Sequence, residues 1–111
     1  MSARAEQALD ALGNPVRRQI LGMLAQRPRP VREIADALPI SRPAVSRHLK
    51  VLRQAGLVTS TAHGTQNIFS LDRVGFDDVR HWIEGFWDEA LARFALLAEN
   101  TAPNTQDQES P

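Results

Sequence analysis

The sequence predicts a mainly α-helical domain that carries one small β-hairpin. Apolar residues recur at intervals of three and four in five segments, which is the spacing of one face of an α-helix. Two β-prone runs, 57–61 and 66–71, flank the segment 62–65, whose glycine permits a hairpin turn. Glycine and proline residues separate the segments, so the expected order is four helices, the hairpin and a last helix.

The size and composition are those of one folded domain. A length of 111 residues allows one compact domain with a short tail, because domains are typically about 100 to 200 residues long. Hydrophobic residues make up 42% and charged residues 23%, a balance that excludes a disordered or collagen-like chain. We expect residues 1–99 to form the domain and residues 100–111, which lack large apolar side chains, to be disordered. Cysteine is absent, which excludes disulfides, thiolate metal sites and a cysteine nucleophile.

The chain shows no signal for targeting or membrane insertion. Its first residues lack the apolar core of a signal peptide. The longest uninterrupted apolar stretch, 94–98, is far shorter than the roughly 20 residues that a membrane span needs. We therefore expect a soluble, cytoplasmic protein without a membrane partner.

The first two predicted helices are separated by residues that end one helix and begin the next. Helical spacing predicts a helix over 2–12, which Gly13 interrupts. Asn14 followed by Pro15 is typical of an N-cap and a first helical position. The second helix then runs to about Gln26.

A short helix and a longer one are expected next, joined by a tight turn. A loop around Pro28 and Pro30 precedes a predicted helix over 31–38, which the next proline ends. Ser41 is a suitable N-cap for a helix over 42–55, and a glycine follows this helix as its stop. A turn this short sends the two helices off at a steep angle, so the sequence predicts a helix-turn-helix with the hairpin as a wing.

The last predicted helix begins at about Asp72 or Gly75, ends at Glu99 and carries a wide apolar stripe. Some 24 residues at about 1.5 Å each give a helix about 36 Å long. A core built from the preceding residues is too small to cover this length, so part of the stripe needs a second chain. The stripe consists of Phe76, Val79, Ile83, Phe86, Ala90 and Leu97, widened by Trp82, Trp87, Leu91 and Phe94, and only Arg93 interrupts it.

Basic residues are concentrated in one third of the chain, although the formal net charge is +0. The segment 17–53 holds nine basic and two acidic residues, a net charge of +7, while the remainder holds four basic and eleven acidic residues, a net charge of −7. This segment is a candidate surface for a polyanion. Twelve of the thirteen basic residues are Arg, which suits bidentate contacts to phosphate or guanine but also fits a GC-rich genome.

The outward face of the predicted helix 42–55 suits duplex DNA. One α-helix fits the major groove, where Arg reads guanine and Ser reads donors or acceptors, while the flanking phosphates attract Arg or Lys. A solvated charged face is the alternative for a lone basic helix, but the preceding turn and the following hairpin disfavour it. We assign base edges to Arg42, Pro43, Ser46 and Arg47, and phosphates to Lys50 and Arg53, with further DNA contacts from Ser41, His63 and Thr65.

The predicted wing contributes little charge, because 57–71 contains no Arg or Lys. Thr61, Thr65 and Gln66 are at most neutral phosphate donors. His63, at the predicted wing tip, suits a DNA contact and an ordinary exposed loop position equally well. His48 lies beside the inward row of its helix and is expected to be packed or to cap the helix.

Three features of the sequence together carry a family resemblance. The segments LGNPVRRQILGML and VREIADALPISRPAVSRHLKVLRQAGLV are followed by a hairpin and a long helix. They resemble the ArsR/SmtB family of winged helix-turn-helix repressors over roughly residues 5–98. The most specific part is 41–58, where a Ser, a Val-Ser-Xaa-His-Leu core and a Leu-Xaa-Xaa-Ala-Gly-Leu-Val ending stand at the family's spacing.

The resemblance implies a homodimeric bacterial transcription factor that binds an inverted repeat, a pseudo-palindromic operator, and usually represses its own operon. It also implies dimerisation through the first and last helices. Aromatic residues of the last helix suit either an interface core or a small-molecule pocket at the dimer seam, and we expect the interface core. The candidate interface residues are Leu9, Phe76, Val79, Ile83, Phe86, Trp87, Ala90 and Phe94.

The sequence departs from the family's metal sensors. Where some sensors carry a cysteine pair in the third helix, this chain has no cysteine. The other common site lies on the last helix, where Asp78, His81 and Glu84 are candidates for a weak site across the dimer axis. An ordinary polar helix face is favoured, so we expect no metal and no other cofactor. A derepressor that responds to a metal or small molecule on the last helix is the alternative function.

Catalysis is not expected. The predicted helices leave no glycine-rich phosphate loop and no nucleophile placed with a base. A winged helix that has lost DNA binding is a further alternative, but it would carry acidic or apolar residues on the outward face of 42–55. That face carries Arg, Ser and Lys, which favours DNA.

Overall fold

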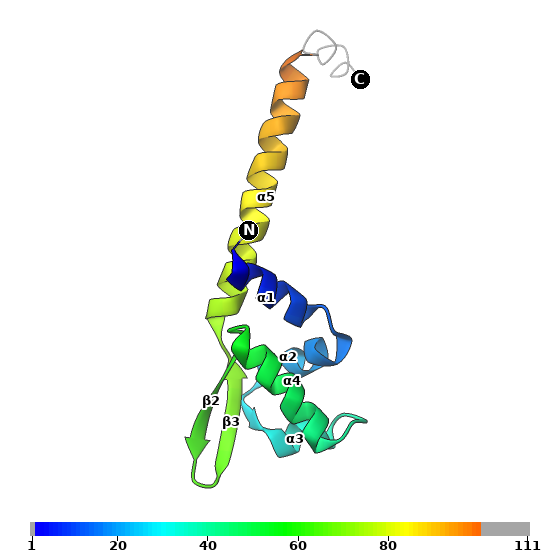
Figure 1. Cartoon of the computed structure of the whole chain (residues 1–111), viewed down its shortest axis with the longest axis vertical. Helices are drawn as coiled ribbons and strands as arrows, with labels where there is room; N and C mark the ends of the chain where they lie inside the picture. The colour runs from blue at the N-terminus through cyan, green and yellow to red at the C-terminus, as the bar shows by residue number, and fades with distance from the viewer. Residues whose placement is uncertain (1, 101–111) are drawn as a thin grey trace. The chain divides into compact units, whose positions relative to one another are not determined.

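The computed structural model describes residues 2–100 and divides into two compact units, one up to Arg80 and one from His81 onward. Residues 101–111, most of the tail predicted to be disordered, lie outside the described residues. The predicted order of four helices, a hairpin and a last helix is confirmed, with one short strand added (Figure 1). The elements are α1 (Ala3–Leu12), α2 (Pro15–Gln26), β1 (Arg29–Pro30), α3 (Val31–Asp36), α4 (Arg42–Gln54), β2 (Val58–His63), β3 (Gln66–Leu71) and α5 (Arg73–Asn100).

The core of the first unit consists of apolar side chains from its helices and from the base of the hairpin. Phe76 and Val79, in the first two turns of α5, pack against this core. None of the described residues that are fully buried is polar or charged, so the core needs no buried hydrogen-bond network. The largest fully buried side chains are Ile20, Ile34, Val45, Leu49, Leu52, Leu57 and Val58.

Local capping residues begin the helices where the sequence predicts them. The side chain of Asn14 accepts a hydrogen bond from the backbone N–H of Arg17 at 3.0 Å, with Pro15 as the first residue of α2. Ser41 accepts in the same way from the N–H of Ala44 at 3.2 Å. Each cap satisfies a backbone donor that has no partner within its helix.

The third helix is shorter than predicted, because α3 ends at Asp36 rather than at Leu38. The N–H groups of Ala37 and Leu38 donate to carbonyls three residues earlier, at 3.2 and 3.3 Å. Such bonds form a tighter turn than an α-helix. A proline disfavours the α-helical conformation of the residue before it, which explains why the α-helix ends before Pro39.

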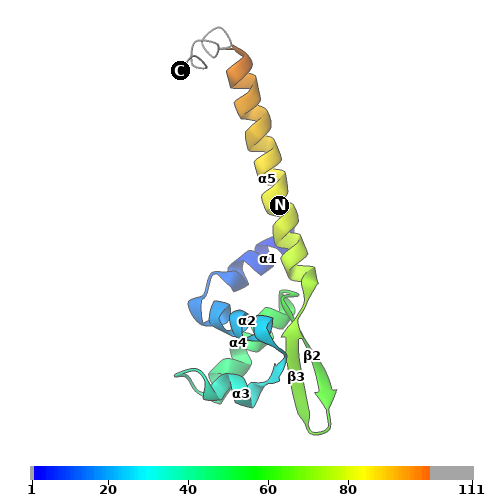
Figure 2. The ribbon, with the colours of Figure 1, turned by 180° about the vertical axis from the view of Figure 1, so that it is seen from behind.

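The sheet has three strands in the order β1-β3-β2 rather than the two of the predicted hairpin. The prediction of a loop around Pro28 and Pro30 is wrong in part. Arg29 pairs with Phe69 and Pro30 pairs with Ile68, so these two residues form the strand β1. Proline suits this position because an edge strand does not need every N–H. The hairpin turn is also tighter than predicted, since β2 continues to His63. Figures 1 and 2 show α3 and the hairpin tip at the same end of this unit.

The part of α5 in the second unit exposes most of its large apolar side chains. The rings of Trp82 and Phe86 stack with centroids 5.9 Å apart, and Phe86 meets Trp87 edge-on at 6.4 Å. In the single chain Phe86 is 58% exposed and Phe94 is 69% exposed. No helix among the described residues is both long and apolar enough to cross a membrane.

Candidate nucleic-acid interface

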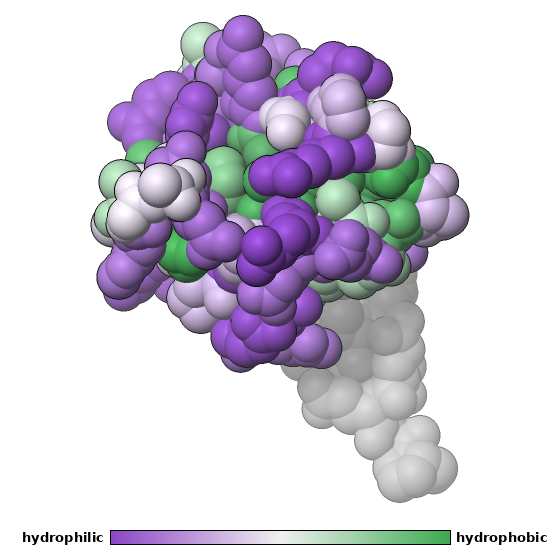
Figure 3. All heavy atoms as spheres, turned by 90° about the horizontal axis from the view of Figure 1, so that it is seen from below, coloured by the Kyte–Doolittle hydropathy of each residue, from purple (hydrophilic) through white to green (hydrophobic). Residues whose placement is uncertain are grey.

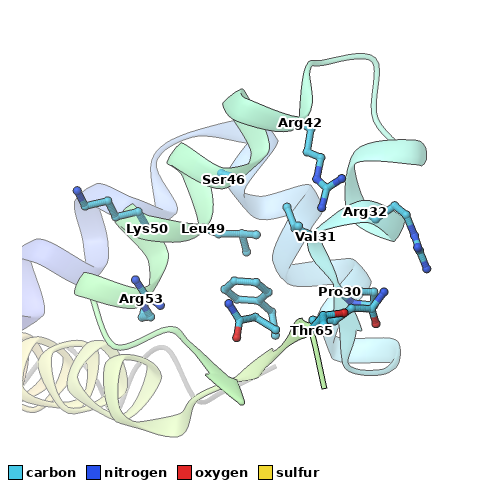
Figure 4. A pocket seen from close by; sticks show the side chains of 12 residues that line it. Pro30, Val31, Arg32, Arg42, Ser46, Leu49, Lys50, Arg53 and Thr65 are labelled. Carbon is cyan, nitrogen blue, oxygen red and sulfur yellow. The ribbon is translucent and has the colours of Figure 1, made fainter. Parts of the chain in front are cut away.

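A groove of about 450 Å³ lies in the first unit between the helix-turn-helix and the hairpin. In Figure 4, α4 carries Ser46, Leu49 and Arg53 along one side of the groove, and Arg32 lies on the α3 side. Figure 3 shows the end of the unit that carries α3 and the hairpin tip, where hydrophilic side chains surround a few hydrophobic ones. The lining residues are Pro30, Val31, Arg32, Arg42, Ser46, Leu49, Lys50, Arg53, Thr65, Gln66, Asn67 and Phe69.

The groove has a strong positive charge. Arg32, Arg42, Lys50 and Arg53 line it, and no lining residue is acidic. Within the described residues, the side chains of the first three form neither an ion pair nor a hydrogen bond. Arg53 donates from Nη1 to the Ser60 hydroxyl at 3.3 Å, and this neutral partner leaves its charge uncompensated. Like charges repel one another, so the groove favours a polyanion that neutralises them.

Four further arginines of the basic segment, which do not line the groove, serve the fold. Arg17 and Arg18 donate to carbonyls at the C-terminal end of α1, both at 2.8 Å. Arg29 donates to a carbonyl in the last turn of α2 at 2.9 Å. Arg27 pairs with Glu33, with 2.6 Å between Nη2 and Oε1, and this hydrogen bond lowers the pKa of the Glu33 carboxyl. The basic side chains that lack a carboxylate or carbonyl partner in this segment therefore all lie on α3 and α4.

The exposed side of α4 carries two rows of side chains. At about 100° per residue, Arg42, Ser46 and Arg53 fall within about 40° of one another, and all three line the groove. Pro43 and Arg47 point roughly opposite the buried row of α4, and both are exposed. The residues predicted to read bases are therefore all on the surface, but they face two directions.

Two further residues predicted to contact DNA, Ser41 and His63, do not line the groove. The hydroxyl of Ser41 is used as the cap of α4. His63 is exposed at the end of β2, paired in the sheet with Gln66. Thr65, in the turn, does line the groove.

The groove also contains Arg32 and Asn67, which sequence reasoning did not select. Arg32 is one of nine basic residues in its segment, and charge counting does not show which of them lack partners. Asn67 approaches α3 because β1 pairs with β3, a contact between segments far apart in the sequence. The only sequence signal for either residue is the polar character of its position.

The three candidate metal ligands are not gathered within the chain. Asp78 pairs with Arg4 instead, at 3.2 Å between Oδ2 and Nε. Among the residues that the structure describes, no group of three His, Asp or Glu side chains is placed to hold a metal ion. The expectation that these residues hold no metal across a dimer axis, where His81 and Glu84 would also take part, stays a prediction.

A helix-turn-helix followed by a β-hairpin, with unpaired cations on the outer side of its second helix, defines a class of transcriptional regulators. Over residues 14–60 the chain matches the family described as bacterial regulatory protein, arsR family. It is 41% identical over 100 residues to the HTH-type transcriptional regulator Rv2034 of Mycobacterium tuberculosis, and the matched region covers 90% of this chain and 94% of that protein. The chain belongs to the ArsR family of helix-turn-helix transcriptional regulators.

Two further relatives support this assignment. The HTH-type transcriptional repressor SmtB of M. tuberculosis is 42% identical over 67 residues, 60% of this chain and 50% of that protein. The structure of the homodimeric winged helix-turn-helix DNA-binding domain of Mb0332 from Mycobacterium bovis matches with a TM-score of 0.61 and 32% identity, covering 81% of this chain and 83% of that one. The predicted fold class is confirmed, and family membership confirms a regulator rather than an enzyme.

Proposed function

We propose that this chain binds a two-fold symmetric operator in duplex DNA as a homodimer and represses transcription in the bacterial cytoplasm. The observation that carries the proposal is the group of five basic side chains without a carboxylate partner on α3 and α4. A surface of this kind attracts the phosphate backbone and places arginines within reach of bases. Repression follows the name of the similar SmtB protein.

The first half of α4 reads bases in this proposal, and the second half contacts phosphates. Arg47 and Pro43 point away from the core, so they enter the major groove most deeply, and Arg42 and Ser46 follow on the groove side. Lys50 and Arg53 of the same helix are assigned to the phosphate backbone.

The homodimer is supported by the exposed stripe of α5 and by the homodimeric Mb0332 domain. Phe76 and Val79 pack against the core of their own chain, so we place the interface chiefly on Ile83, Phe86 and Phe94. A two-fold symmetric dimer presents two α4 helices in opposite directions, which requires an operator with the same symmetry.

The test uses a duplex that the wild-type protein selects from a random-sequence library. Its affinity is compared with that of an unrelated duplex for the wild type, for Arg47→Ala and for Arg73→Ala, an exposed arginine without a partner among the described residues. Arg47→Ala should weaken the selected duplex by about 1 to 3 kcal/mol per contact and reduce discrimination, whereas Arg73→Ala should preserve discrimination. Equal binding of both duplexes by the wild type would refute the proposal.

A further inference from the structure

We propose that Arg32 of α3, together with Gln66 and Asn67 of the hairpin, joins Lys50 and Arg53 of α4 in a seat for one sugar-phosphate strand of DNA. This inference rests on the proposed function. It adds α3 and Asn67 to the DNA contacts and places Gln66, a neutral phosphate donor at most by its sequence, beside them. It assigns the part of the groove between Arg32, Lys50 and Arg53 to the phosphate backbone, whereas Arg42 and Ser46, which also line the groove, keep their assignment to base edges.

The dimensions of DNA and of α4 place a strand in this groove. An α-helix with its side chains is about 10 to 12 Å wide, and the major groove is about 12 Å wide. When the Pro43 and Arg47 edge of α4 enters the major groove, a sugar-phosphate strand must pass along each side of the helix. One side of α4 is the groove-facing row, so a strand that passes there meets α3 and the hairpin opposite.

Arg32 is free to contact that strand. The neighbouring carboxylate, Glu33, forms its ion pair with Arg27 at 2.6 Å, and Arg32 acts on it through its charge alone, which also lowers the pKa of that carboxyl. Asp36 lies one helical turn further along α3, but no ion pair joins it to Arg32 among the described residues. Arg32 is exposed, so its guanidinium loses little hydration before DNA binds and keeps its full charge for a phosphate.

The short strand β1 places the beginning of α3 beside the hairpin. Pro30 pairs with Ile68 in the sheet, and Arg32 follows only two residues later. Gln66 and Asn67 precede Ile68 in β3, so α3 and the hairpin meet at one wall of the groove. In Figure 4 Arg32 and Lys50 stand at opposite sides of the groove, as a strand between them requires.

The hairpin lacks positively charged side chains, and this gives Arg32 a distinct role in the proposed seat. Residues 57–71 contain no Lys or Arg, so the hairpin has only neutral donors for a phosphate. Arg32 supplies from α3 the positive charge that this wall of the groove otherwise lacks. Amide groups of Gln66 and Asn67 then donate to the same strand as neutral hydrogen-bond partners.

The test is the salt dependence of binding for Arg32→Gln, measured on the selected duplex and on an unrelated duplex. Each phosphate contact contributes about 0.9 to the slope of log affinity against log salt concentration. A dimer carries the substitution twice, so the slope should fall by about 1.8 on both duplexes. If the salt plots meet at 1 M, affinity at 0.1 M falls about sixtyfold. Arg32→Lys should keep the slope, and Asn67→Ala should weaken both duplexes without changing it.

Arg73→Gln is the matched control, because it removes the same charge from another exposed arginine outside the groove. An Arg32→Gln slope equal to that of Arg73→Gln would overturn the inference. So would a change in base preference without a change in slope. The proposed function fails separately, when the wild type does not prefer its selected duplex or when Arg47→Ala retains full discrimination.

Discussion

His48 of α4 lies beside Arg17 of α2, and the two side chains connect three helices. Nη1 of Arg17 donates toward Nδ1 of His48 at 3.5 Å, and Nε of the same arginine donates to a carbonyl at the end of α1. Partial burial lowers the pKa of His48, and the charges of Arg17 and Arg47 lower it further. The imidazole is therefore neutral at pH 7, which leaves Nδ1 available as an acceptor, and it serves the fold as expected for a packed histidine.

The lowered pKa of His48 makes stability depend on pH. The unfolded chain binds the proton first as the pH falls through the ordinary pKa of about 6.5. The free energy of unfolding therefore falls from there down to the folded pKa and is constant below it as far as this group is concerned. His48→Gln removes the imidazole that titrates. The variant should therefore lose less stability than the wild type between pH 7.5 and 5.5, as measured by urea titrations. Parallel pH curves for the two proteins would contradict this.

At the scale of the elements, two glycines let the end of α4 meet the beginning of α5. The N–H of Gly75 donates to the carbonyl of Gly56 at 2.7 Å, and Gly56 has a φ of 74°. A Cβ on Gly75 would lie 2.5 Å from the carbonyl oxygen of Ala55 and 2.8 Å from the carbonyl carbon of Gly56. These neighbours are backbone atoms, so only a movement of the two helix ends would relieve the overlap.

Gly75→Ala should therefore destabilise the first unit, by about 1 to 3 kcal/mol or more. Gly22→Ala is the matched control, because Gly22 lies within α2 and an added Cβ has no neighbour within 4 Å. An alanine there should raise the free energy of unfolding by about 0.5 to 1 kcal/mol through its greater helix propensity. Chemical denaturation of both variants measures the difference. Equal effects of the two substitutions would show that the close contact at Gly75 is unimportant.

The elements that the sequence predicted well are those with local signals. Ser41 and Asn14 cap their helices through bonds to residues three positions on, and such spacing is visible in the sequence. β1 was not predicted, because two residues show no period and their partners lie some forty positions away in β3. For the same reason Arg32 was absent from the predicted site, since its proposed role depends on the surroundings that β1 creates.

The roles of the basic side chains also depend on partners that are distant in the sequence. The sequence showed that 17–53 is strongly basic, but Arg17 and Arg18 cap α1 while Arg32 has no partner among the described residues. These three residues are alike in sequence and differ only in which carbonyl or carboxylate the fold brings near. The base-reading assignment of Arg47 needed no such information, because helical spacing alone places it opposite the buried row.

At the scale of the whole molecule, the exposed stripe of α5 is best explained by a second copy of the chain. Leu91 is 57% exposed and Leu97 is 61% exposed in the single chain, in line with Phe86 and Phe94. Contiguous apolar surface of this kind is costly in water and marks an interface. A shallow groove of about 320 Å³ on this face, lined by Phe86, Glu89, Ala90, Arg93, Phe94 and Leu97, offers room for side chains of a partner.

Phe86→Asp should therefore separate the dimer while leaving the first unit folded, because Phe86 is no part of that unit's core. Sedimentation at micromolar concentration should show a dimer for the wild type and a monomer for the variant. Operator affinity should fall about a hundredfold or more, because two linked half-site contacts become independent. Ala92→Asp is the matched control, since at about 100° per residue it adds the same charge to the opposite face of α5 and should leave a dimer. A variant at Phe86 that still sediments as a dimer, with unchanged operator affinity, would place the interface elsewhere on the chain.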